Sequence, residues 1–301
     1  MNMKNFKLIE NRNIFLGFSL VMMALSVILV ATLGIKQGID LRGGTQWEIK
    51  FSNSEVTSDS IKNVLLGLST DKENYVRQTS DGTFVIRIKS LDEAQHSQYK
   101  SALAKLGEFS EQNFSSIGPT IGIELRNRSI KAIIFVLLGI SLYIAYAFRK
   151  VSKPISSWKY GFATLISLFH DVVIPTGFLA FLGWYKGVEM DTNFIVALLV
   201  VMGFSVHDTI VVFDRIRENL LTHRGKNFTL AEIINISVRE TFVRSINTTL
   251  TLIIVLIALL LLGPSSLFYF ILIILVGTVF GTYSSIFLAS PILYLWGSKS
   301  E

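Results

Sequence analysis

The sequence predicts a polytopic α-helical membrane protein with six transmembrane helices and one α+β extracytoplasmic domain between the first and second helices. Three observations support this fold class. Half of the 301 residues are hydrophobic, and the mean hydropathy is +0.52, which is typical of membrane proteins. Six apolar runs are long enough to cross the hydrocarbon core of a bilayer as helices. The one long segment without such a run, residues 35–128, mixes strand and helix patterns.

The orientation of the helices follows from the charges that flank the apolar runs. These runs are residues 14–34, 130–148, 160–183, 193–213, 246–263 and 267–290. Lysine and arginine gather before the first run, between the second and third, between the fourth and fifth, and after the sixth. Because cytoplasmic loops carry an excess of these residues, both termini are predicted in the cytoplasm. The first run is long and offers only a weak cleavage site, so we expect a retained anchor.

The chain is predicted to divide into three parts. Residues 1–34 hold the cytoplasmic N-terminus and first helix, residues 35–128 the extracytoplasmic domain, and residues 129–301 helices two to six with a cytoplasmic C-terminus. Within the domain, strand patterns lie at 45–51, 75–79, 83–90 and 110–118, helical patterns at 56–68 and 91–107, and a turn at Ser80-Asp81-Gly82. The order β-α-β-β-α-β predicts the ferredoxin-like split motif. That fold hosts many functions and indicates no activity.

Composition excludes several classes of site. The chain has no cysteine, so it has no disulfide and no thiolate metal site. Its net charge of +6 lies in short loops beside apolar runs, which favours membrane lipids over nucleic acid as the partner. The glycine-rich stretch GIDLRGG (residues 38–44) lacks the GxxxxGK[ST] pattern, so we expect a turn there and no nucleotide or other cofactor.

Asp208 is the principal candidate for a functional residue. With His207 it lies in the apolar part of GFSVHDTIVVFDRIREN (residues 203–219), where a charged side chain costs about 2.5–3.5 kcal/mol on insertion scales. Such an aspartate can carry a proton, because burial favours the neutral acid and a nearby cation favours the carboxylate. Arg244, at the start of the fifth run, is the candidate cation. The alternative is a static ion pair that joins two helices, and both interpretations remain open.

A second His-Asp doublet, His170-Asp171, lies in the third run. Adjacent residues point about 100° apart on a helix, and the chain has no HExxH motif. We therefore expect no metal site. Asp171 can either form a hydrogen bond between helices or take part in a proton route.

The fourth helix is predicted to continue past the membrane in VVFDRIREN (residues 211–219). Asp214, Arg215, Arg217 and Glu218 can pair at i,i+3 and i,i+4 spacing, and spacing alone favours a solvated helix end with anchoring charges. Gly277 and Gly281 have the spacing of close helix packing. Pro175 and Pro291 are expected at bends or helix ends.

Six motifs together resemble the SecF family of bacterial Sec protein-export subunits, within the resistance-nodulation-division superfamily. They are GIDLRGG, GPTIGIELRNRSIKA, LFHDVVIPTG, GFSVHDTIVVFDRIREN, RSINTTLT and GTYSSIFLASP, in family order and spacing. The stretch VVFDRIREN separates SecF from its sister subunit SecD. The family-motif positions are Gly38, Asp40, Gly43, Gly44, Gly118, Pro119, Asp214, Arg215, Arg217 and Asn219. Three positions depart from the family: Leu41 replaces Phe, Phe204 replaces Tyr, and His207 replaces Asn beside the key aspartate.

The resemblance implies a non-enzymatic subunit of the bacterial inner-membrane translocase. With SecD and the SecYEG channel, and with YajC and YidC as further partners, it would use the proton motive force to promote late, ATP-independent export of unfolded polypeptide. The resemblance assigns the proton to Asp208 and its cationic partner to Arg244, with Asp171 and His207 as further candidates and a third acid from SecD.

Three other functions compete with this interpretation. A proton-driven small-molecule exporter half would normally carry two large outer domains on a longer chain. An intramembrane enzyme would need a nucleophile or a ligand set on one face, which the sequence does not offer. A structural assembly factor would use Asp208 and Arg244 only as a pair.

Overall fold

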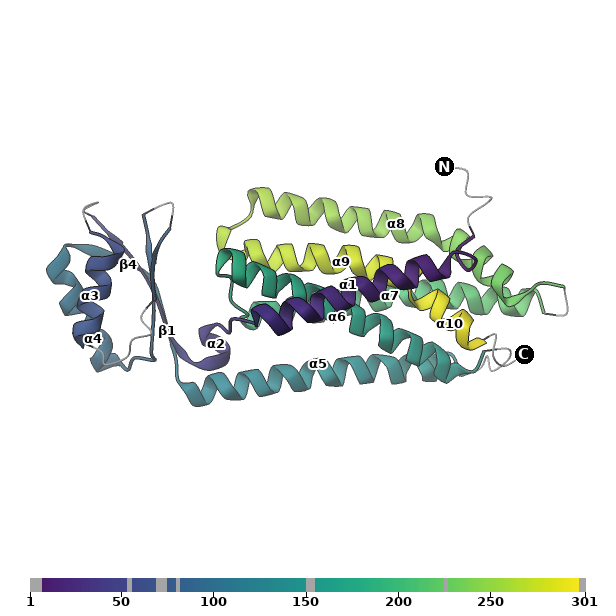
Figure 1. Ribbon diagram of the computed structural model, residues 1–301, viewed down its shortest axis with the longest axis horizontal. Helices are drawn as coiled ribbons and strands as arrows, with labels where there is room; N and C mark the ends of the chain where they lie inside the picture. The colour runs from purple at the N-terminus through teal and green to yellow at the C-terminus, as the bar shows by residue number, and fades with distance from the viewer. Residues whose placement is uncertain are drawn as a thin grey trace. The chain divides into compact units, whose positions relative to one another are not determined.

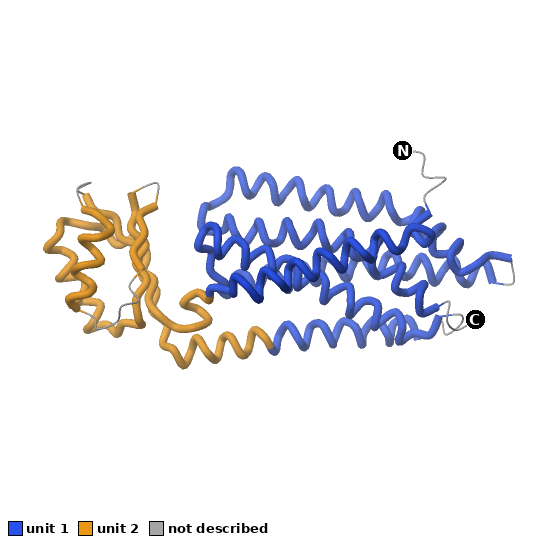
Figure 2. The backbone as a smooth tube through the Cα atoms, in the orientation of Figure 1, with its two compact units in different colours: residues 1–36, 131–301 blue, residues 37–130 orange. Residues whose placement is uncertain are grey.

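The computed structural model describes residues 7–52, 56–68, 75–79, 82–149, 155–224 and 227–297. The chain forms two compact units (Figure 2): a helical unit of residues 1–36 and 131–301, and a smaller unit of residues 37–130. The predicted extracytoplasmic domain, residues 35–128, differs from the smaller unit by two residues at each end.

Six helical segments within the described residues are long and apolar enough to cross a membrane. They are α1 (Arg12–Leu33), α5 (Pro119–Ala147), α6 (Ser157–Lys186), α7 (Thr192–Thr222), α8 (Leu230–Leu262), and the combination of η3 (Ser265–Leu267), α9 (Phe268–Phe287) and α10 (Ala289–Gly297). The six predicted helices are therefore confirmed. Several helices extend well beyond the apolar runs, because local charged sequence is compatible with helix where packing or capping supports it.

The ends of α7 and α8 are set by side-chain caps. The Asp191 carboxylate accepts a hydrogen bond from the Phe194 backbone N–H at 2.9 Å, at the start of α7. Thr229 and Glu232 form a reciprocal capping box at the start of α8. These caps satisfy backbone donors that have no partner inside the helix. The cap at Thr229 explains why α8 begins sixteen residues before its apolar run at residue 246.

Small residues allow the helices of the bundle to approach closely. A Cβ atom added to Gly281 would lie 3.0 Å from Ser205 Cβ, and one added to Gly277 would lie closer still to Val201 Cγ2. Helix α9 therefore lies directly against α7, as Figure 1 shows. This packing confirms the interpretation of the Gly277–Gly281 spacing.

The expectation for the two prolines is confirmed for Pro291, which lies at the N-terminal end of α10, whereas Pro175 does not end its helix. Pro175 lies inside α6, which continues to Lys186, and Pro291 lies in the first turn of α10. A proline is well tolerated in a first turn, because the backbone N–H there has no partner within the helix.

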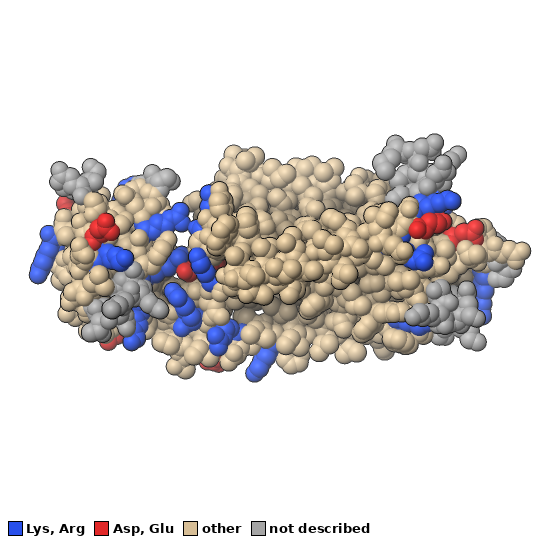
Figure 3. Space-filling model, in the orientation of Figure 1, with Lys and Arg blue, Asp and Glu red and all other residues tan. Residues whose placement is uncertain are grey.

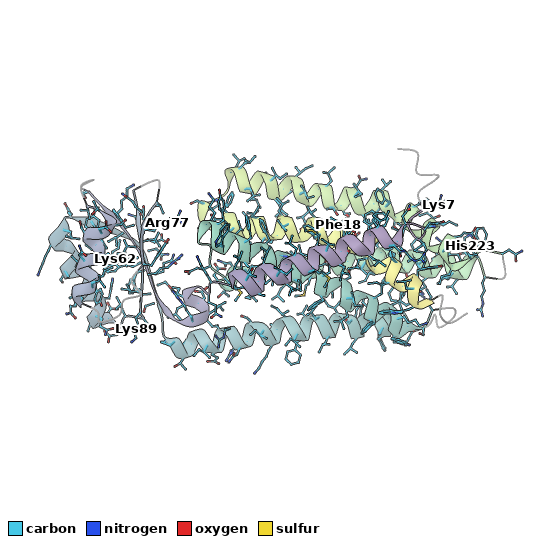
Figure 4. All side chains as sticks on the ribbon, viewed as in Figure 1. Lys7, Phe18, Lys62, Arg77, Lys89 and His223 are labelled. Carbon is cyan, nitrogen blue, oxygen red and sulfur yellow. The ribbon has the colours of Figure 1, made fainter. Side chains whose placement is uncertain are left out.

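The outward surfaces of α1, α5 and α8 are apolar. Large hydrophobic side chains are exposed along all three helices, including Ile14, Phe135 and Leu262. On the face drawn in Figure 3, the middle of the helical unit shows no Lys, Arg, Asp or Glu, and charged side chains lie towards both of its ends, including the end at which Figure 1 labels α10. Figure 4 labels Lys7 and His223 at that end and Phe18 along α1. A charge-free band of this kind fits the hydrocarbon core of a bilayer.

The smaller unit is a four-stranded antiparallel sheet accompanied by short helices. Its elements are α2 (Ile39–Arg42), β1 (Gly44–Phe51), α3 (Ser58–Leu68), β2 (Tyr75–Gln78), β3 (Phe84–Ile88), α4 (Glu93–Leu103), η2 (Ala104–Leu106) and β4 (Phe109–Ile117). The strand order is β2-β3-β1-β4. The predicted order of strands and helices is confirmed, and the predicted turn at Ser80-Asp81 lies outside the described residues.

The hydrophobic core of this unit is formed by side chains that alternate in direction along the strands. Every second residue of β1 and β3 points inward, including Trp47, Ile49 and Ile86. These side chains pack against apolar positions of α3 and α4, such as Ile61 and Leu103. The pattern is that of a sheet with one buried face.

The GIDLRGG stretch forms the short helix α2 and then enters β1. Gly43 has φ +83° and ψ 164°, a conformation adopted almost only by glycine. A Cβ atom there would lie 2.6 Å from Pro119 Cα. Gly44 pairs with Ile117 at the end of β4. The family-motif positions 43, 44, 118 and 119 therefore meet where β1 begins and β4 ends.

Candidate functional site

Asp208 lies on α7 and is almost completely buried, with 5% of its surface exposed. Ser245 of α8 donates a hydrogen bond from Oγ to Asp208 Oδ1 at 2.5 Å. The other carboxylate oxygen, Oδ2, is buried and has no hydrogen-bond partner among the described residues. A buried oxygen without a donor is costly as part of a carboxylate and much less so as part of a neutral acid. This asymmetric environment suits a group that changes its protonation state.

Arg244 and His207 flank this acid but are exposed. Arg244 precedes Ser245 on α8, and His207 precedes Asp208 on α7. Within the part of the chain that the structure describes, Asp208 and Arg244 form no ion pair within 4.0 Å. Asp208 therefore uses a hydroxyl as its direct partner, and the guanidinium acts on it through space.

Asp171 lies on α6, fully buried, in a different environment. Its Oδ2 accepts hydrogen bonds from Ser205 Oγ of α7 at 2.5 Å and from Ser284 Oγ of α9 at 2.9 Å. Its Oδ1 lies 2.9 Å from His170 Nδ1. Three donors surround this carboxylate, so it is well satisfied in its charged form. Asp171 connects three helices.

His170 contacts its own neighbour in sequence. Its Nε2 atom is buried and finds no partner among the side chains that the structure describes. If Nδ1 carries the proton and donates it to Asp171, the bare Nε2 leaves no donor unsatisfied. A protonated imidazole would bury an unpaired N–H. The geometry therefore favours a neutral His170.

Hydroxyl groups continue from both acids along the α7–α9 and α8–α9 contacts. Ser285 Oγ of α9 lies 2.8 Å from Thr209 Oγ1, and Thr249 Oγ1 of α8 lies 2.7 Å from Thr282 Oγ1. All four side chains are buried. Their hydrogen bonds hold α9 in register with both neighbouring helices.

The charged half of α7 is not simply a solvated helix end. Asn219 is buried and donates from Nδ2 to Ser237 Oγ at 3.0 Å and to Glu240 Oε2 at 2.8 Å, both on α8. Arg215 donates to Glu218 at 2.5 Å and to Glu240 at 2.7 Å. The predicted i,i+3 pairs are present, including Arg217–Asp214 at 3.4 Å. The interhelical contacts correct the interpretation from spacing: the motif joins α7 to the first turns of α8.

The described residues before α1 contact the N-terminal part of α8. Asn235 of α8 accepts from the Ile9 backbone N–H at 3.1 Å and donates to Glu10 at 2.9 Å. The Arg12 guanidinium lies 5.3 Å from the centre of the Tyr294 ring in α10. Residues 9 and 10 are therefore held to α8, and the first turn of α1 contacts α10.

Several residues of this site escaped the sequence analysis, above all Ser205, Ser245 and Ser284. Their only signal was a hydroxyl at a regular position in an apolar run. A metal site was not expected, and among the described residues no group of three His, Asp or Glu side chains is placed to hold a metal ion. Asp171 and Asp208 share no hydrogen-bond partner among the described residues.

Six apolar helices that bury two aspartates among them define a multi-pass membrane protein with intramembrane ionisable residues. The chain belongs to the SecD/SecF family of protein-export membrane proteins: the model of their C-terminal region matches residues 98–299, and the model of the SecD/SecF GG motif matches residues 28–55. Membership assigns the chain a role in protein export.

Individual relatives agree with this family. The protein translocase subunit SecF of Thermobaculum terrenum is 41% identical, over 96% of this chain and 93% of that protein. The protein translocase subunit SecDF of Brucella abortus is 31% identical, over 94% of this chain and 36% of that protein. A crystal structure of SecDF from Thermus, described as translocon-associated, is 30% identical with a TM-score of 0.83. It covers 99% of this chain, which spans 40% of that longer protein.

Proposed function

We propose that this protein uses the proton motive force to promote the late, ATP-independent phase of protein export, with Asp208 as the proton carrier. The observation that carries the proposal is the environment of that acid. Asp208 is buried in an apolar helix, has a single hydrogen-bond donor and keeps one oxygen without a partner among the described residues. Ionisable residues in such positions mark proton and ion routes.

Arg244 is the cation whose attraction to Asp208 changes when that acid takes up or releases its proton. It is exposed, it precedes the residue that donates to Asp208, and no ion pair within the described residues holds it there. Movement of α8 relative to α7 therefore changes the distance between the cation and the acid. One charge that crosses 100 mV releases about 2.3 kcal/mol, and shifts of about 1–3 kcal/mol are enough for allosteric coupling.

The partner is SecD. The exposed His207 and Arg244 lie on helices that otherwise belong in hydrocarbon, where polar groups are costly unless protein or water covers them. The longer SecDF relatives carry additional sequence beyond the part that this chain matches. We infer that SecD covers this face and supplies a third acid, and that the complex works with SecYEG, YajC and YidC on unfolded polypeptide.

We also propose the arrangement in the membrane. Both termini are cytoplasmic, and the smaller unit is a periplasmic domain of the ferredoxin-like class that contacts the emerging polypeptide. The flanking positive charges support the orientation. The strand order β2-β3-β1-β4 supports the fold class. The protein acts as a transport subunit and not as an enzyme.

The test uses membrane vesicles that contain the complete translocase. Completion of a precursor's translocation is followed after ATP is exhausted, with and without an imposed proton gradient. We expect the gradient to accelerate completion with the natural protein and not with Asp208→Asn at matched levels of the complex.

Asp191→Asn is the matched control. It makes the same chemical change on the same helix and retains a good N-cap. An equal response of Asp208→Asn and the natural protein would refute the role of Asp208 as proton carrier. Loss of the complex in Asp208→Asn would instead support the structural assembly factor.

A further inference from the structure

Ser245 is the one side chain among the described residues that donates a hydrogen bond to Asp208. It is fully buried, and its donor atom lies 2.5 Å from Oδ1 of the acid. The two carboxylate oxygens of Asp208 therefore differ. Oδ1 is held by a hydroxyl from the neighbouring helix, whereas Oδ2 is buried without a partner in the described ranges.

The position of Ser245 is itself held by the packing of α8. One turn further on, Thr249 Oγ1 donates to the backbone oxygen of Ser245 at 2.8 Å and lies 2.7 Å from Thr282 Oγ1 of α9. This pair of bonds fixes the rotation of α8 at the level of Ser245. The hydroxyl is thus directed at Asp208 by a contact with a third helix.

Few charged groups face this acid. His207 on α7 and Arg244 on α8 act on it through space. Helix α9, which packs against both, contains no Asp, Glu, Lys, Arg or His. On α6, Asp171 is hydrogen-bonded to His170 and to serines of α7 and α9. The direct contact from Ser245 is therefore the local interaction that distinguishes the two oxygens.

We propose that Ser245 is a positioning residue that holds Oδ1 of Asp208 and leaves Oδ2 as the atom that takes up and releases the proton. This inference rests on the proposed function. On uptake, an O–H bond forms at Oδ2 and the negative charge of the carboxylate is neutralised. Ser245 keeps its own proton and its bond to Oδ1, which becomes the carbonyl oxygen of the acid. Release reverses both changes.

Two measurable consequences follow. A bond donated to a carboxylate stabilises the charged form more than the neutral acid, so its loss should move the titration midpoint of Asp208 upward by about one to two pH units. Because Oδ1 is the carbonyl oxygen of the protonated acid, loss of the bond should also raise the frequency of its C=O stretching band.

The experiment is pH-difference infrared spectroscopy on the complex with SecD in liposomes. The carboxylic-acid band that disappears in Asp208→Asn identifies the acid. Ser245→Ala removes the donor, and Ser245→Thr keeps it. Ser141→Ala is the matched control, because that serine is buried on α5 and bonds only its own helix.

We expect Ser245→Ala to shift the midpoint and the band frequency upward, and Ser245→Thr and Ser141→Ala to leave both unchanged. An unchanged midpoint and frequency in Ser245→Ala would overturn the proposal. If that variant does not assemble, Ser245→Cys serves instead: its weaker donor should give a smaller shift in the same direction, and no shift would overturn the proposal. A natural complex with no titrating Asp208 band would refute the proposed function itself.

Discussion

Replacement of Asp171 decides whether this second buried acid is a helix connector or a proton carrier. Asp171→Ala removes the acceptor of the hydrogen bonds from Ser205 on α7 and Ser284 on α9. Hydrogen bonds between membrane helices contribute about 0.6 kcal/mol on average and at most about 1.7 kcal/mol. The two bonds therefore contribute about 1–3 kcal/mol.

The variant also leaves His170 without a partner. Its Nδ1 lies 2.9 Å from the carboxylate that is removed, and an unsatisfied buried donor costs about 1 kcal/mol or more. Ser284 is less affected, because its hydroxyl also lies 2.9 Å from the Gly281 backbone oxygen. We expect the free energy of unfolding to fall by about 2–4 kcal/mol in total.

The assay is reversible unfolding of the purified protein by titration with a denaturing detergent. Asp171→Ala, Ser205→Ala and the double variant form a cycle, and the coupling between the two sites should be about 0.6–1.7 kcal/mol. Ser141→Ala again serves as control, with a change below about 0.5 kcal/mol.

Two results would refute this reasoning. One is an Asp171→Ala variant with unchanged stability. The other is an Asp171→Asn variant that assembles normally, binds SecD and yet loses the response of export to a proton gradient. The second result would make Asp171 a proton carrier, an alternative that its three surrounding donors argue against.

Two further predictions concern packing. Gly43→Ala should destabilise the smaller unit by about 1–3 kcal/mol through its backbone conformation alone, and more through the clash with Pro119; increased proteolysis of that unit within the whole chain would show it. Gly82 also has positive φ but open space around it, so Gly82→Ala should destabilise the unit less. Equal destabilisation by the two variants would exclude a contribution from the clash with Pro119. Asn219→Ala should cost about 1–3 kcal/mol, because its two bonds to α8 are lost. Thermal unfolding of this variant, compared with that of Thr222→Ala, checks the prediction, because the Thr222 hydroxyl bonds only its own helix. Equal melting temperatures of the two variants would contradict the interhelical role of Asn219.

The local sequence pattern was sufficient to predict the helices and strands of this fold. The six helices follow from apolar runs of membrane length, and the strands of the smaller unit follow from alternation, as in residues 45–51. Asp208 was recognisable for the same local reason, because a charge inside an apolar run is expensive whatever its neighbours are.

The partners of the buried acids were not recognisable in this way. A serine in an apolar helix can bond the carbonyl oxygen of its own preceding turn, as Ser141 does, or a group on another helix, as Ser245 does. Both serines lie in apolar helices, so the sequence around them does not distinguish a bond within the helix from a bond to another helix. Similarly, the charges of VVFDRIREN pair locally as expected, but the burial of Asn219 against α8 depends on how far that helix extends.

The sequence by itself thus determined the class of the protein, its elements and the acid on which its function is proposed to depend, because these follow from the cost of placing polar groups in hydrocarbon. Only the tertiary structure decided that Asp171 is surrounded by three donors whereas one oxygen of Asp208 has no partner among the described residues. The difference arises from the rotation and close approach of α7, α8 and α9, which small residues permit and which no single helix can specify.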